Sequence, residues 1–137
     1  MARPLDPVSA LLKLVDACYQ CALIFRITAE QSKSDAFQRF SGKLRATLDR
    51  FGFELQTEIR RIEDSDFREL RSYRESADDA EPLEARCENV LRRTVREYEV
   101  AQAGYMPAHA RAMIQRQLQT VSQLWEQFDQ FQARAAG

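Results

Sequence analysis

The chain has little of what most catalytic and metal sites need. Its 137 residues include one histidine, three cysteines and four glycines. A carboxylate-bridged di-metal site uses two Glu-x-x-His motifs, so one histidine is too few, and His109 alone would have to serve any serine or cysteine nucleophile. The glycines form no phosphate-binding loop pattern. The sequence therefore predicts no catalytic, cofactor-binding or metal-binding residue.

An excess of either charge is also absent. Twenty basic residues against twenty-one acidic ones, interspersed along the chain, give a formal net charge of −1. This balance provides no basic face for phosphates or anionic lipid. No uninterrupted apolar run approaches the ~20 residues of a membrane span, and the N-terminal segment lacks the pattern of an export signal. We therefore expect a cytoplasmic protein without nucleic-acid or membrane partners, in a reducing compartment that suits three cysteines.

Apolar residues at helical spacing are plentiful. The clearest stripe advances in steps of three and four residues and contains Phe37, Phe40, Leu44, Leu48, Phe51, Leu55, Ile59 and Ile62. These steps place every member on one face of an α-helix roughly 40 Å long, which needs partners of similar length. The sequence predicts one all-α domain over 1–137, a four-helix bundle with helices at about 7–31, 34–63, 83–104 and 107–132.

The other three predicted helices have stripes of their own. In the first helix the stripe is Val8, Leu11, Leu12, Val15, Cys18, Tyr19, Ala22, Phe25 and Ala29. In the third it is Leu83, Cys87, Val90, Leu91, Thr94, Tyr98, Ala101 and Tyr105, and in the fourth Ile114, Leu118, Val121, Leu124, Trp125, Phe128 and Phe131. Asp6 and Ser34 are expected N-caps and Gly104 an expected stop. We expect the tail from Gln132 to fray.

The expected connections differ in length. Tight connections join the first helix to the second and the third to the fourth, whereas about eighteen residues, 64–82, join the second to the third. We expect a long crossover that makes helices two and three parallel, as in ferritin-like bundles. Within this connector Phe67, Leu70 and Tyr73 recur every three residues, which fits a short helix, while its many charges fit a solvated loop. A helical connector folded back on itself would restore the simple up-down arrangement.

Two segments, LLKLVDACYQCALIFRITAE and RFGFELQTEIRR, share an outline with a known group. The matching residues are Leu11, Leu14, Val15, Phe25, Glu30, Phe51, Glu54 and Leu55. In them the chain resembles the bacterial ferritin-like family catalogued as domain of unknown function 2383. The family's Asp and Gly are replaced by Gln20 and Ile24, and Trp125 and Glu126 stand where the family tends towards His-Asp. The resemblance implies a ferritin-like fold and, since the family has no established activity, no functional residue.

Several side chains next to the stripes have the chemistry of metal ligands. They are Glu54, Glu58, Glu97, Glu99 and His109. The residue three before the histidine is Met106, so the Glu-x-x-His motif is missing. We interpret the carboxylates as the solvated edge of the apolar seam, paired with basic neighbours. Examples of such pairs are Arg50 with Glu54 and Arg93 with Glu97.

Cys18 and Cys21 form a CxxC pattern. The pair lies inside a predicted helix, unlike a thioredoxin-type redox pair, and a zinc site would have only Cys87 and His109 to complete it. We interpret Cys18 and Cys87, which lie on stripes, as small core residues.

Most aromatic residues lie where a core needs filling, although a pocket between helices is the alternative. These residues are Phe25, Phe37, Phe40, Phe51, Tyr98, Trp125 and Phe128. Phe53 lies beside its stripe and Phe131 at the end of its own, and we expect both to be exposed or to cover a second surface. A homodimer interface or the inner face of the connector would explain them.

Two hypotheses for function remain. The favoured one is a non-enzymatic interaction or oligomerisation module on a metal-free ferritin-like scaffold, with a protein partner or a second copy. The alternative is a ferritin-like metal-binding or stress-related oxidoreductase with a carboxylate-only site.

Overall fold

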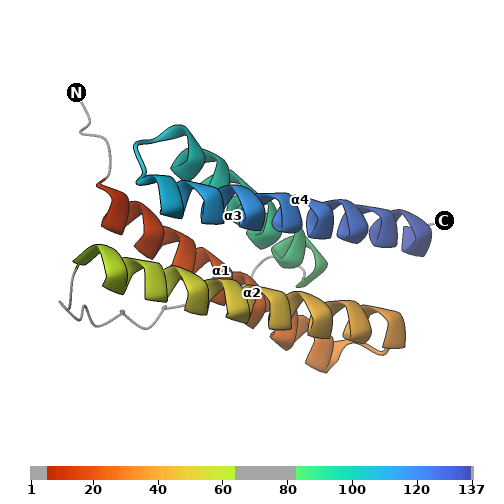
Figure 1. Cartoon of the computed structure of the whole chain (residues 1–137). Coiled ribbons are helices and arrows are strands. Elements are labelled where there is room, and N and C mark those ends of the chain that lie inside the picture. The colour runs from red at the N-terminus through yellow and green to blue at the C-terminus, as the bar shows by residue number, and fades with distance from the viewer. Residues whose placement is uncertain (1–5, 64–82, 137) are drawn as a thin grey trace.

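The computed structural model describes residues 6–63 and 83–136, and nearly all of them lie in four α-helices (Figure 1). The helices are α1 (Pro7–Gln31), α2 (Asp35–Glu63), α3 (Leu83–Ala103) and α4 (Ala108–Ala136). The predicted all-α, four-helix architecture is confirmed, and no strand occurs in the described parts. The connector predicted at about 64–82 lies outside the described residues.

The helix ends follow the capping signals in the sequence. Asp6 Oδ1 accepts the backbone N–H of Ser9 at 2.8 Å, and Ser34 Oγ accepts that of Phe37 at 3.1 Å. Both side chains satisfy a donor of the first helical turn that has no partner inside the helix. The helix α3 ends at Ala103, directly before Gly104.

The helix α4 continues to Ala136, beyond its predicted end at about residue 132. The physical reason is packing near the end of α4. The ring of Phe131 stacks on Phe40 with centroids 6.5 Å apart and contacts Phe37 at 6.0 Å. These contacts with α2 anchor the last turns of α4 to the bundle.

The directions of the helices follow from contacts between them. Ser41, early in α2, donates to the carbonyl of Phe25, late in α1, at 2.9 Å, so α1 and α2 are antiparallel. Cys87, early in α3, donates to Thr28 of α1 at 3.2 Å, so α1 and α3 are also antiparallel. The helices α2 and α3 therefore run in the same direction (Figure 1), as the predicted crossover requires.

The helix α1 is the central element, because it packs closely against both α2 and α3. Its buried residues consequently extend beyond the predicted stripe to Leu14, Cys21 and Ile24. At Gly52 of α2, a Cβ atom would lie 2.7 Å from the ring of Tyr19. Glycine therefore lets that ring lie directly against the α2 backbone.

By length and composition α1 is also the one described helix that could cross a membrane. Lys13 and Asp16 interrupt its apolar sequence, so the helix contains no long unbroken apolar run. In the bundle, 56% of its most apolar window is buried against the other helices. A core helix of this kind has the same composition as a membrane span.

Candidate functional site

A chain of hydrogen bonds crosses the core and joins all four helices. Tyr98 of α3 donates its hydroxyl hydrogen to Gln117 Oε1 of α4 at 2.6 Å. Gln117 Nε2 donates to Glu54 Oε1 of α2 at 2.9 Å. On the other side, Cys18 Sγ of α1 lies 3.2 Å from the Tyr98 hydroxyl. Because the tyrosine uses its single hydrogen towards Gln117, the thiol of Cys18 is the donor in this contact.

This core hydrogen-bond chain is neutral along most of its length. Cys18, Tyr98 and Gln117 are fully buried. Burial raises the pKa of Cys18 to about 12 and that of Tyr98 well above its usual value of 10. Neither group ionises near neutral pH, so Cys18 is not a reactive thiolate. The charged member of the chain is Glu54 at its end, and Arg116 contacts Glu54 at 3.2 Å near the surface.

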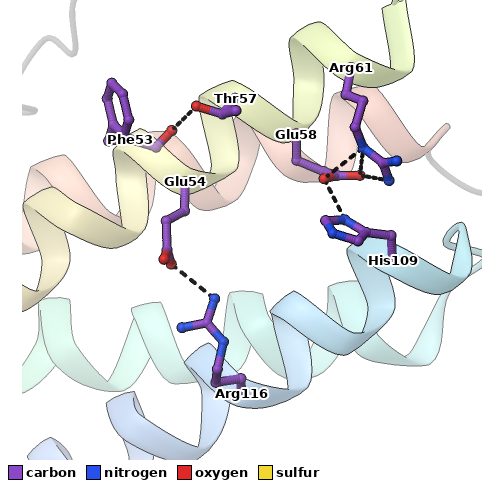
Figure 2. A network of polar contacts seen from close by, with 7 residues as sticks. All are labelled: Phe53, Glu54, Thr57, Glu58, Arg61, His109 and Arg116. Carbon is purple, nitrogen blue, oxygen red and sulfur yellow. Dashed lines mark hydrogen bonds and ion pairs between the residues drawn. The ribbon is translucent and has the colours of Figure 1, made fainter.

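A second polar cluster joins the last turns of α2 to the first turn of α4 (Figure 2). Glu58 is 2% exposed and is held by Arg61 at 2.7 Å and by His109 Nδ1 at 2.8 Å. A carboxylate only accepts hydrogen bonds, so Nδ1 of His109 carries the hydrogen. The cluster ties the two helices together at a buried anion.

The electrostatics of the cluster keep Glu58 ionised. Burial raises the pKa of Glu58, but the hydrogen bonds from Arg61 and His109 outweigh burial, so the pKa lies below its ordinary value of 4.5. The carboxylate accepts hydrogen bonds from two donors, Arg61 and His109. The arrangement is that of a structural ion pair rather than of a general acid.

Two predictions about these carboxylates are wrong. Glu58 does not lie at a solvated edge, because it is turned towards α4 and covered there. Glu54 pairs with Arg116 across the interface, while the guanidinium of Arg50 lies 5.7 Å from the ring of Phe51. Spacing along one helix could not reveal the competing partner on α4. The suggested pair of Arg93 with Glu97 is likewise not formed in the described structure.

The structure brings two of the candidate metal ligands together, Glu58 and His109 at 2.8 Å, but it does not gather the full set. Glu54 and Glu58 face α4, whereas Glu97 of α3 lines a groove beside α1. Glu99 is exposed one residue from the buried Tyr98. In the described ranges no three His, Cys, Asp or Glu side chains are grouped as metal ligands.

The three cysteines are buried thiols, in agreement with the core interpretation of Cys18 and Cys87. They lie along the α1–α3 seam, each beside a hydroxyl group of the facing helix. Cys18 meets Tyr98, Cys21 meets Thr94, and Cys87 meets Thr28. Burial raises the pKa of Cys21 as well. The CxxC pattern is therefore one part of a helix-packing seam.

Phe53 and Phe131, the two aromatic residues expected to be exposed or to cover a second surface, differ in exposure. Phe53 is 67% exposed, as expected, and points away from α4 (Figure 2). Phe131 instead packs on α2 and is partly buried, so its predicted exposure is wrong. The rings of Phe37 and Phe40 on α2 contact Phe131 and cover part of it.

An open groove lies between α1 and the end of α3, and we name it the α1–α3 groove. It has a volume of about 310 Å³ and is lined by Ala10, Lys13, Glu97, Val100, Ala101, Ala103, Gly104 and Tyr105. Val100 is 56% and Tyr105 76% exposed. The prediction that Tyr105 continues the buried stripe is wrong, because α3 ends at Ala103 and Tyr105 no longer follows its helical face.

Sequence reasoning missed Gln117 and Arg116 as parts of the core hydrogen-bond chain. A signal for Gln117 existed, because it lies three residues after Ile114 and four before Val121, both members of the stripe. A polar residue at such a position needs a buried partner. Finding that partner, Tyr98, required the packing of α3 against α4.

No protein-family model matches the chain, and no curated protein is significantly similar to it in sequence.

Proposed function

We propose that this protein is a non-enzymatic helical module that acts by protein association, on a ferritin-like scaffold without a resident metal. The observation that carries the proposal is the contrast between core and surface. The central polar groups, Tyr98 and Gln117, are neutral and satisfied by one another, while exposed apolar side chains line the α1–α3 groove. Such a surface is typical of a binding protein.

The scaffold part of the proposal rests on topology. The helices α2 and α3 are parallel, and each is antiparallel to α1. A bundle with one long crossover between its second and third helices is the ferritin-like arrangement. The resemblance to the bacterial family of unknown function agrees with this proposal. We also propose a cytoplasmic location, without nucleic-acid or membrane partners, since charges of both signs are interspersed.

The alternative is a carboxylate-only metal-binding oxidoreductase. It is favoured by the position of Glu54 and Glu58, one turn apart on α2 and both turned towards α4 (Figure 2). Arg61 and Arg116 already neutralise these carboxylates. A metal ion would have to displace both guanidinium groups.

Metal analysis separates the two functions. We expect protein purified without chelator to contain no stoichiometric iron or manganese. Its melting temperature should be unchanged when metal is added. Stoichiometric metal that is lost in Glu54→Ala but kept in Glu97→Ala, its counterpart on another face, would establish the alternative.

A further inference from the structure

The exposed apolar residues of the described structure are distributed unevenly. Val100 and Tyr105 lie together in the α1–α3 groove. Phe53 stands apart on α2, where its helical neighbours one turn away, Arg50 and Thr57, are polar. A single exposed ring is common on protein surfaces, whereas clustered apolar groups in a groove indicate a contact site.

We propose that the α1–α3 groove is the surface through which two copies of this chain associate. This inference rests on the proposed function, protein association, and names the partner and the surface. The groove presents Val100 and Tyr105 as an apolar centre, with charged residues beside it. This arrangement is the usual anatomy of a protein interface.

The charges beside the groove indicate that the partner bound there is a second copy of the chain. Lys13 belongs to α1 and Glu97 to α3, and neither forms an ion pair with another described residue. A two-fold axis parallel to the helices places α1 of one copy over α3 of the other. Lys13 of each copy then faces Glu97 of the other, so one surface is complementary to itself.

The alternative two-fold arrangement is disfavoured by the same charges. An axis across the helices would place α1 over α1, which brings Lys13 of both copies together. Like charges facing each other across an interface are unfavourable. The proposal is therefore the parallel axis, with Tyr105 of both copies in the contact.

Charge exchange tests the pairing directly. By sedimentation velocity we expect Lys13→Glu alone, or Glu97→Lys alone, to weaken self-association about tenfold, because each replaces two attractions by two repulsions. An equimolar mixture of the two variants restores association as a heterodimer, and the double variant restores the homodimer. Circular dichroism of each variant confirms that the helices are retained.

Two further variants fix the surface. Tyr105→Ser removes the aromatic contact and is expected to weaken association at least as much as the charge reversals. Phe53→Ser is the matched control on α2 and leaves association unchanged. A wild-type chain that stays monomeric at high micromolar concentration would overturn the inference, whatever its metal content says of the proposed function. If the chain dimerises, and the dimer is unaffected by both charge reversals but dissociates in Phe53→Ser, then the α1–α3 groove is not the interface. The proposed function, protein association, would still hold.

Discussion

The two halves of the contact between α2 and α4 are built from opposite chemistry. Near the α1–α2 turn, the rings of Phe37 and Phe40 pack on Phe128 and Phe131. Towards the other end, Glu54 and Glu58 reach residues at the start and middle of α4. The same two helices thus meet through an aromatic half and a polar half.

The spacing of the two helices explains the need for large side chains. The backbones of α2 and α4 seldom approach closely, in contrast to those of α1 and α2. Rings fill the space in one half, and long carboxylate and amide side chains span it in the other. Apolar area stabilises without regard to direction, whereas each hydrogen bond requires one partner in one place. We infer that the aromatic half supplies stability and the polar half fixes the pairing.

The largest expected effect breaks the aromatic half. Phe128 is 2% exposed and contacts Phe25, Phe40 and Trp125. Phe128→Ala should lower the free energy of unfolding by about 3–5 kcal/mol, because it removes buried area and leaves a cavity. Urea denaturation followed by circular dichroism measures this loss. Phe53→Ala is the control and should change stability by less than about 0.5 kcal/mol.

The next effect breaks the polar half at its centre. Gln117→Leu leaves the buried hydroxyl of Tyr98 without its acceptor and should cost about 1–3 kcal/mol. Adding Tyr98→Phe removes the stranded hydroxyl as well, so the double variant should be more stable than Gln117→Leu alone. Denaturation of the two single variants and the double variant measures this coupling. Simple additivity would contradict the role assigned to the core hydrogen-bond chain.

The polar half of the α2–α4 contact should respond to pH and the aromatic half should not, because only the polar half contains ionisable side chains. The pKa of Glu58 is lowered below 4.5 in the folded chain, so its contribution to stability is full above that value. The contribution is lost as the pH falls through the lowered pKa. Unfolding measured from pH 6 to pH 2.5 should show this decline, and Glu58→Gln should remove part of it. Phe128→Ala should keep the whole decline.

The smallest effect concerns the exposed end of the polar half. Arg116 contacts Glu54 at 3.2 Å, but its side chain is 55% exposed. Arg116→Ala should therefore cost only about 0.2–1 kcal/mol, and less in high salt. Denaturation at low and high ionic strength measures the difference. A loss as large as that of Gln117→Leu would mean that the guanidinium, rather than the amide, holds the core chain together.

Much of the fold could be predicted because it depends on local pattern. The stripe on α2 is buried or packed against the core along its whole length, and Asp6 and Ser34 cap as expected. The prediction for α1 was incomplete. One stripe was assigned to it, yet Leu14 and Ile24 are also buried, because two neighbours cover this helix. Periodicity reports the apolar face of a helix but not the number of helices around it.

The candidate site was harder to predict for the same reason. Glu58 and Gln117 are polar residues whose burial depends on partners that are distant in sequence. Tyr105 has stripe spacing but lies beyond the end of α3, so it is exposed. In each case the exposure of the side chain is set by a contact between helices or by the end of a helix, and not by its spacing along the chain.

Residue types and steps of three and four residues are enough to specify four amphipathic helices, their caps and the scarcity of metal-binding and catalytic motifs. The packing of the helices decided that Cys18, Tyr98, Gln117 and Glu54 form one chain. It also decided that Glu58 is covered and that the α1–α3 groove lies open. Hydrogen bonds and burial between helices depend on which faces meet, and that is settled only when the helices pack together.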